Sequence, residues 1–472
     1  MKIVYINPPY GNDFVRSARW AAKSRGRVQR HPEQALIQIA VLEKAGNDCK
    51  FIEGAARNMA KKEILDEVSV FGPDLAIIHS TTPSIYSDID YAKTLKENKK
   101  CKTVMVGAHA SAEPEDTLKN ADGALDIVVR GEPEYTLRDI AAGLPLKEML
   151  GISYFQAGKI FHNPDRPYIN VNELPFPSWK HIDPKWYHDA GKLYPFLTLY
   201  TGRGCFGMCT FCRETQVTNG RILRMRSAKK VVDEMEYDLL LFPYLKEIMF
   251  ETDTFTAVPS HVKEVCEEII KRGLNKKISW SCNVRTDINL DLLSIMKKAG
   301  CRMLMVGFEF GTNKQLDSVK KGTTIEKGRE FAETANKLGF IIHGCFMIGA
   351  PGETKESAQE TIDFAKSLPM DTIQVSGIAA YPGTEFYRWA KEKNYILPKN
   401  WSEWLDDNHE QATILSYPQM SKDEINFYID KALKEFYLRP KQMLKMITAV
   451  RTFDDVKRKF YGLKSFLDYF WK

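Results

Sequence analysis

Residues 201–215 read TGRGCFGMCTFCRET and contain three cysteines, Cys205, Cys209 and Cys212, at C-x3-C-x2-C spacing. An apolar run that predicts a β-strand precedes them, and two glycines open the loop in which they stand. A loop this short can direct three sulfurs toward one point, and thiolates select iron–sulfur clusters, zinc or Cu(I). The stretch therefore predicts a metal centre at the end of a strand.

The number of ligands separates the two main kinds of centre. A structural zinc ion normally takes four ligands, often as two separated pairs. The nearest further candidates are His188 upstream and Cys266 downstream, both distant in sequence. Three thiolates on a cubane leave one iron without a protein ligand, and a substrate can bind there. We therefore expect a [4Fe–4S] cluster, with zinc or unliganded thiols as the alternatives, and the other six cysteines as small buried side chains.

The residues around this loop indicate the larger fold. Residues 196–390 alternate six β-rich runs with helical patterns. Six βα units in about 200 residues predict an incomplete parallel barrel, because a full eight-unit barrel usually needs about 250 residues. Residues 1–145 alternate five buried strands with helical patterns, which predicts a doubly wound, Rossmann-like sheet. We expect an α/β protein with these two domains, a linker over 146–195 that holds a hairpin, and a helical region over 391–472.

The cysteine spacing at the end of a first barrel strand resembles the signature of the radical S-adenosylmethionine (SAM) superfamily. The resemblance implies that Cys205, Cys209 and Cys212 hold a [4Fe–4S] cluster and act in catalysis. It also implies that the open iron chelates the amino and carboxylate groups of SAM. Reductive cleavage of SAM then gives methionine and a 5′-deoxyadenosyl radical, which abstracts hydrogen from an unactivated carbon.

Motifs at the ends of the later strands follow the order that this superfamily shows. The resemblance places the motif at 250–253 near the SAM amino group, Arg285 on its carboxylate and Glu309 on a ribose hydroxyl. A guanidinium fork suits a carboxylate. Taken singly, each motif is equally compatible with an ordinary turn or a rim ion pair; their order behind the cysteines favours the joint interpretation. The residues that the resemblance assigns to SAM are Phe211, Glu251, Asp253, Arg285, Glu309, Gly349, Pro351, Tyr381 and Pro382.

A doubly wound domain ahead of such a barrel resembles the cobalamin-binding radical SAM enzymes, over about the first 390 residues. In open parallel sheets the ligand lies outside the carboxyl ends of the strands, where this chain has small or polar residues. The residues that the resemblance assigns to cobalamin are Asn7, Pro8, Pro9, Ser80, Thr81, Thr82, Gly107, His109, Arg130, Gly131 and Glu132.

The most specific cobalamin motif is absent from the expected place. Many cobalamin domains carry D-x-H-x-x-G after the first strand, whereas this loop reads NPPYGNDF. We therefore expect no histidine beneath the cobalt, and a domain that binds nothing remains an alternative. We expect His109 to contact the edge of the corrin or its nucleotide rather than the metal, and His31 and His79 to make ordinary polar contacts.

The resemblance implies an enzyme that uses a [4Fe–4S] cluster, SAM and cobalamin to methylate an unactivated carbon. The alternatives are cyclisation, oxidation or carbon–carbon bond formation on a lipid or tetrapyrrole with the same cofactors, and, remotely, a non-catalytic iron–sulfur protein. The resemblance to class B methyltransferases and to the anaerobic magnesium-protoporphyrin ester cyclase group also implies a small-molecule, lipid or tetrapyrrole substrate. An external electron donor such as flavodoxin or ferredoxin is expected.

Composition limits the partners. The 472 residues carry a formal charge of +6, which is too small to indicate nucleic acid without a basic patch. No apolar run reaches bilayer length and the N-terminus lacks signal-peptide features, so we expect a cytoplasmic protein. Segment 16–30 has six basic residues, no acidic one and Trp20, which suits a solvated loop or one that faces cobalamin or an anionic substrate. The basic, aromatic stretch 437–472 predicts a terminal helix or a peripheral membrane contact.

Overall fold

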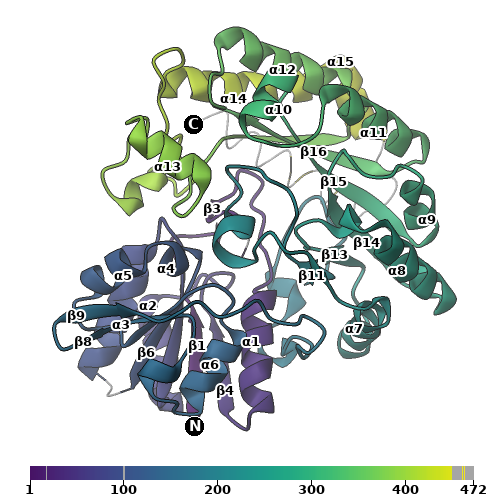
Figure 1. Cartoon of the computed structure of the whole chain (residues 1–472). Coiled ribbons are helices and arrows are strands. Elements are labelled where there is room, and N and C mark those ends of the chain that lie inside the picture. The colour runs from purple at the N-terminus through teal and green to yellow at the C-terminus, as the bar shows by residue number, and fades with distance from the viewer. Residues whose placement is uncertain (18, 99–100, 449–455, 457–459, 461, 463–472) are drawn as a thin grey trace.

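The computed structural model describes residues 1–17, 19–98, 101–448, 456, 460 and 462. Figure 1 shows two units side by side: an N-terminal α/β unit, coloured purple to blue, and a larger unit whose strands run from teal to green. This arrangement confirms the predicted combination of a doubly wound domain and a partial barrel. The C-terminal helices, in yellow-green, lie on the second unit.

The N-terminal sheet has the strand order β4-β1-β5-β6-β7-β8-β9, and its first five members are parallel. Alternate residues of its central strand β1 point to opposite faces: Ile3 and Tyr5 pack with α1 and α6, whereas Val4 and Ile6 pack with α2 and α3. Helices therefore cover both faces, which is why the parallel strands are apolar throughout. The elements are β1 Lys2–Asn7, α1 Glu33–Lys44, β4 Asp48–Glu53, α2 Lys61–Phe71, β5 Leu75–Ser80, α3 Ile85–Asn98, β6 Lys102–Gly107, α4 Ala108–Ala112, α5 Pro114–Ala121, β7 Ile127–Val129 and α6 Glu134–Ala141.

A hairpin extends this sheet. The strands β8 (Ile152–Gln156) and β9 (Lys159–His162) pair with each other, and β8 pairs antiparallel with β7. The turn falls at Ala157 and Gly158, as the sequence predicts. The segment that the sequence indicates as a linker thus adds two strands to the N-terminal sheet before the chain crosses to the barrel.

The second sheet contains six parallel strands in the order β10-β13-β14-β15-β16-β17. A helix follows each of the first five strands, and Figure 1 shows these helices on the outer side of the sheet. All six predicted strands are confirmed. The elements are β10 Phe196–Leu199, α7 Ala228–Leu241, β13 Glu247–Phe250, α8 Pro259–Lys271, β14 Ser279–Val284, α9 Leu292–Lys298, β15 Cys301–Glu309, α10 Asn313–Ser318, α11 Ile325–Lys337, β16 Ile341–Ile348, α12 Lys355–Ser367 and β17 Thr372–Gly377.

The C-terminal region is partly helical. The helices α13 (Glu385–Glu392), α14 (Lys422–Tyr437) and α15 (Pro440–Thr448) are present, but residues 395–420 are largely irregular apart from a short 3-10 helix at Trp401–Trp404. Of the basic, aromatic stretch 437–472, the positions after 448 lie outside the described residues except for 456, 460 and 462. Within the described part of the chain, no helix is both long and apolar enough to cross a bilayer.

Candidate active site between the two domains

The cysteine loop is held by a small antiparallel ribbon. The strands β11 (Gly202–Arg203) and β12 (Arg224–Met225) pair at its base. Gly204 has φ +84°, and an added Cβ would overlap the carbonyl oxygen of Ile222. Only glycine avoids both the left-handed strain and this overlap. The glycine therefore lets two chain segments meet directly before the first cysteine.

The three thiols have polar and charged neighbours within the protein. Cys205 and Cys209 are buried and Cys212 is half-buried. The backbone N–H of Gly207 donates to the Cys205 sulfur at 3.3 Å, and the hydroxyl of Thr254 lies 3.4 Å from the same sulfur. The Arg285 guanidinium lies 3.9 Å from the sulfur of Cys209.

At Cys212 the effect of burial outweighs that of the nearby cation. Burial raises the pKa of the Cys212 thiol to about 11, whereas the nearby Arg19 acts to lower it. Adjacent cations are what stabilise a thiolate. Among the described residues, no three His, Cys, Asp or Glu side chains converge closely enough to hold a single metal ion. A cubane puts each cysteine on a different iron, and three thiols with amide, hydroxyl and guanidinium neighbours fit such a cluster.

The end of β13 is tied to the cysteine loop. Asp253 accepts hydrogen bonds from the backbone N–H of Gly204 at 3.0 Å and from the side chain of Asn219 at 2.9 Å. Arg19 donates to the carbonyl of Thr252 at 2.8 Å. Glu251 lies 3.6 Å from Arg30. Of the acidic residues that the sequence assigns to SAM, Asp253 is thus placed beside the cysteine loop, and Glu251 lies beside Arg30.

The ends of β14 and β15 meet in a second ion-pair group. Arg285 forms two hydrogen bonds to Asp287, at 2.8 and 2.9 Å, and donates to the carbonyl of Lys321 at 2.6 Å. The ammonium of Lys321 in turn binds Glu309 at 2.6 Å. The structure therefore brings Arg285 and Glu309, predicted as separate SAM contacts, into one connected group next to Cys209.

The motifs that follow β16 and β17 are turns, and a neighbouring side chain contacts each of them. The carboxylate of Glu353 accepts from the backbone N–H groups of Gly349 and Ala350. The Arg213 guanidinium lies 5.4 Å from the centre of the Tyr381 ring. Phe211 is half-buried and packs on the main apolar core. Pro351 and Pro382 stand in the same two turns.

A cavity of about 920 Å³, part of it open to solvent, lies between the carboxyl ends of the N-terminal strands and the barrel. Both domains contribute to its wall, as expected for a ligand at the carboxyl edge of a doubly wound sheet. Gly131 has φ +70°, with open space where a side chain would stand, so the wall there is bare backbone. The predicted residues that line the cavity are Ser80, Thr81, Gly107, Gly131 and Glu132 on one side and Glu251 and Asp253 on the other.

The remaining residues assigned to cobalamin do not line the cavity: Asn7, Pro8, Pro9, Thr82, His109 and Arg130. His109 begins the turn of α4 and is buried, with its ring edge-on to Trp401 at 4.9 Å between centroids. Arg130 points to the hairpin, where it donates to the carbonyl of Ile152 at 2.6 Å and pairs with Asp165 at 2.7 Å. In the positions that the structure gives them, His109 and Arg130 make contacts that stabilise the N-terminal unit.

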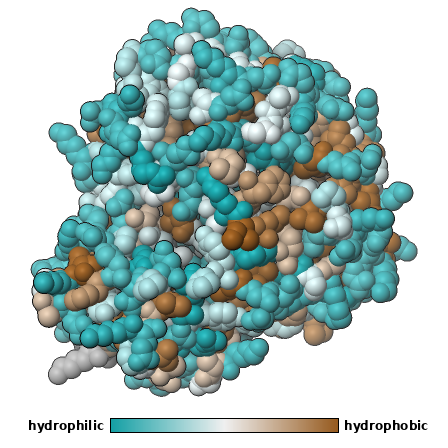
Figure 2. Space-filling view, viewed as in Figure 1, coloured by the Kyte–Doolittle hydropathy of each residue, from teal (hydrophilic) through white to brown (hydrophobic). Residues whose placement is uncertain are grey.

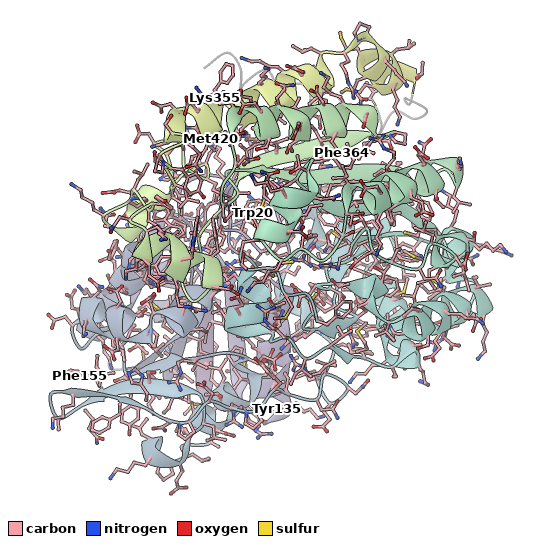
Figure 3. The ribbon with its side chains drawn as sticks, turned by 45° about the horizontal axis from the view of Figure 1, so that its top comes forward. Trp20, Tyr135, Phe155, Lys355, Phe364 and Met420 are labelled. Atoms are coloured by element: carbon pink, nitrogen blue, oxygen red, sulfur yellow. The ribbon has the colours of Figure 1, made fainter. Side chains whose placement is uncertain are left out.

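Several cavity residues escape sequence reasoning because they come together only in the fold. The barrel contributes Tyr200, Arg203 and Arg213, and the N-terminal unit contributes Arg19 and His79. The basic segment 16–30, which contains Arg19, is the one feature of the sequence that pointed to any of these cavity residues. Figure 3 shows Trp20 of that segment near the middle of the molecule, between the N-terminal unit and the C-terminal elements, so this segment crosses the interface instead of projecting into solvent.

Sequence comparisons agree with this architecture. The sequence profile of the radical SAM superfamily matches residues 199–365, and that of the B12 binding domain matches residues 29–141. The chain is 32% identical over 471 residues to an uncharacterized methyltransferase (PH0819) of Pyrococcus horikoshii, with 98% of each chain covered. It is 25% identical over 496 residues to the anaerobic magnesium-protoporphyrin IX monomethyl ester cyclase of Rubrivivax gelatinosus, which covers 98% of this chain and 84% of the cyclase.

A solved structure shares the whole fold. The radical SAM methyltransferase TsrM of Kitasatospora setae, solved with cobalamin and a [4Fe–4S] cluster, matches with a TM-score of 0.72, 14% sequence identity and 98% of both chains covered. The two domains therefore occur in the same order and arrangement in both proteins. The chain belongs to the cobalamin-binding radical SAM enzymes, which use a [4Fe–4S] cluster, SAM and cobalamin.

Proposed function

We propose that this enzyme transfers a methyl group to an unactivated carbon of a small-molecule substrate. The observation that carries the proposal is a cavity whose wall joins the strand ends of the cobalamin domain to Glu251 and Asp253, beside the cysteine loop. When bound, the cluster and SAM supply a hydrogen-abstracting radical, and cobalamin supplies the methyl group. A substrate in this cavity lies between the two sources, and bringing reactants together in this way lowers the barrier.

The residues of this chain have separate tasks in that reaction. Cys205, Cys209 and Cys212 hold the cluster, while the Arg285 guanidinium receives the carboxylate of SAM. Glu309 accepts a ribose hydroxyl. The backbone of the turns at Gly349 and Tyr381 would approach the adenine.

The cobalamin side is built from backbone and small side chains. Ser80, Thr81, Gly107 and Gly131 line the cavity. The hydroxyl groups of Ser80 and Thr81 are bonded within the protein, to the carbonyl of Val106 at 2.9 Å and to the hydroxyl of Ser84 at 2.6 Å. The charged side chains of the wall are already paired: Arg203 with Glu134 at 2.6 Å, for example. A wall with paired charges suits a cofactor whose rim carries neutral amides.

The decisive experiment supplies SAM with a deuterated methyl group. The anaerobic enzyme with cobalamin, reductant and SAM is incubated with lipid or tetrapyrrole extracts, and products are identified by mass spectrometry. Transfer of the labelled methyl group to a carbon of the product supports the proposal. A product that has lost two hydrogens and carries no label supports the second candidate, radical cyclisation. The likeness to the Rubrivivax gelatinosus cyclase over almost the whole chain is what favours that candidate.

We propose a docking site for an external electron donor on the outer side of the cysteine loop. Figure 2 shows apolar side chains gathered in the middle of the viewed face, where the teal segments around β11 lie in Figure 1. Phe206, Met208 and Ile222 are 51%, 52% and 62% exposed, and Arg221 donates to the carbonyl of Gly207 among them. We propose that a small acidic flavin or iron–sulfur protein docks here. Phe206→Ser is then expected to slow reduction of the cluster by such a donor and to leave reduction by dithionite unchanged.

A further inference from the structure

His79 stands at the end of β5, one residue before the strand ends at Ser80, and lines the cavity between the domains. Gly107, the last residue of the neighbouring strand β6, allows the ring to stand there. An added Cβ on Gly107 would lie 3.0 Å from the Cδ2 atom of His79 and would overlap the carbonyl oxygen of Ser80. The bare backbone of Gly107 therefore leaves room beside the imidazole on its cavity side.

Hydrogen bonds fix the orientation of the ring. Nδ1 of His79 lies 3.3 Å from Oδ1 of Asn7. The amide nitrogen of Asn7 donates to Glu53 at 2.8 Å, so its oxygen is the atom that faces the histidine. Glu53 also accepts from the hydroxyl of Tyr187 at 3.0 Å. Since Oδ1 accepts, Nδ1 carries the proton and Nε2 carries the free lone pair.

Nε2 is open toward the cavity. No described residue forms a hydrogen bond with it, and it is not among the sealed polar atoms of the described chain. His31, the other histidine of the cavity wall, differs: both of its ring nitrogens are sealed. Its ring packs at a tilt against Tyr187, 4.1 Å between centroids, and meets Phe196 edge-on at 4.9 Å. His109 does not line the cavity. Of the three histidines near the predicted cobalamin site, His79 alone presents a lone pair to it.

We propose that Nε2 of His79 is the lower axial ligand of the cobalt, with Asn7 and Glu53 as positioning residues. A metal-binding histidine commonly donates its other nitrogen to an oxygen acceptor that fixes the tautomer, and the Asn7 contact supplies this. The inference rests on the proposed use of cobalamin. It replaces the expectation that no histidine lies beneath the cobalt, because the ligand comes from β5, the third strand of the N-terminal sheet in chain order, and not from the loop after β1.

The experiment is electron paramagnetic resonance of the holoenzyme reconstituted with cob(II)alamin. An axial nitrogen splits each cobalt line, into three with nitrogen-14 and into two with nitrogen-15. The enzyme is prepared once with ordinary histidine and once with nitrogen-15 histidine. We expect the splitting to change from triplets to doublets, and His79→Ala to abolish it. His162→Ala, which removes an exposed histidine of β9, is expected to keep it.

A second variant separates coordination from folding. Asn7→Leu keeps His79 but removes its acceptor, and we expect cobalamin to bind about 10–100-fold more weakly while the cluster absorbance stays close to that of the unaltered enzyme. Triplets that persist with labelled histidine would show that the base of cobalamin itself is the ligand. Spectra without nitrogen splitting, or doublets that survive in His79→Ala, would equally overturn the inference. Each of these outcomes leaves the proposed methyl transfer intact, whereas failure to bind any cobalamin would remove both.

Discussion

The guanidinium of Arg285 lies 3.9 Å from the sulfur of Cys209 and is held there by two hydrogen bonds to Asp287. One arginine thus joins the end of β14 to the cysteine loop that precedes it by more than seventy residues. We propose that the remaining edge of its fork receives the amino acid end of SAM, since a guanidinium fork suits a carboxylate.

Arg285→Lys is the first test. Lysine keeps the charge but cannot reproduce the fork to Asp287, and hydrogen bonds to charged groups are each worth about 1.5–3 kcal/mol. We expect SAM to bind at least about tenfold more weakly, with iron content near that of the unaltered enzyme. Equilibrium binding of SAM under anaerobic conditions measures this. Arg329→Lys, on the exposed face of α11, is the matched control, and equal affinities in the two variants would refute the assignment.

Gly204→Ala tests the geometry of the loop. The added Cβ would overlap the carbonyl of Ile222, so the ribbon must open and displace Cys205. Gly158→Ala is the control, because Gly158 also has a positive φ, +78°, but nothing lies near its Cβ position. Both variants carry left-handed strain of about 1 kcal/mol. We expect only Gly204→Ala to lose most of its iron after reconstitution; an equal loss in both would show that the overlap is immaterial.

The segment 16–30 is anchored by a buried ion pair. Arg16 and Asp88 form two hydrogen bonds, at 2.8 and 3.0 Å, and both side chains are fully buried. Removing one partner of such a pair costs about 3–5 kcal/mol, because a charge is left buried and unpaired. We expect Asp88→Ala to lower the urea midpoint clearly and Arg16→Met with Asp88→Leu to restore most of it. If the double variant is as unstable as the single one, packing rather than charge is responsible.

Glu353 makes stability depend on pH. Burial raises the pKa of Glu353 from 4.5 to about 7, although the N–H groups of Gly349 and Ala350 oppose the shift. The folded protein therefore keeps a proton that the unfolded chain releases, so stability falls as the pH rises from about 4.5 to about 7. We expect Glu353→Gln to remove this fall and to be more stable at pH 8 by on the order of 2 kcal/mol.

Unfolding of Glu353→Gln by urea between pH 5 and pH 8 measures the effect. Glu360→Gln, at an exposed position of the same helix α12, is the control and should follow the unaltered protein throughout. Parallel pH profiles for the unaltered protein and Glu353→Gln would show that Glu353 releases its proton equally easily in both states.

Features that depend on neighbouring residues could be predicted from the sequence. The cysteine trio is contiguous, and each parallel strand is a short apolar run bounded by turns, so the metal centre, both sheets and the hairpin followed from local pattern. Contacts between distant segments could not be predicted. His109 directly follows the strand-end pair Gly107 and Ala108, which suggested a ligand contact, but α4 begins at Ala108 and turns the ring beneath Trp401.

His79 shows the opposite case. In the sequence it looks like an ordinary strand residue. Only the fold shows that Asn7 from β1 orients its ring and that Gly107 from β6 leaves space beside it. Arg19 reaches the carbonyl of Thr252 across the domain interface, a contact that basic composition alone does not specify.

Formation of 5′-deoxyadenosine from SAM by the anaerobically reconstituted, reduced protein tests the central claim most directly. Iron-loaded protein is expected to produce it, Cys266→Ala is expected to produce it equally, and Cys209→Ala is expected to produce none. Protein that binds zinc instead of iron, or a Cys209→Ala variant that cleaves SAM at the unaltered rate, would contradict the account.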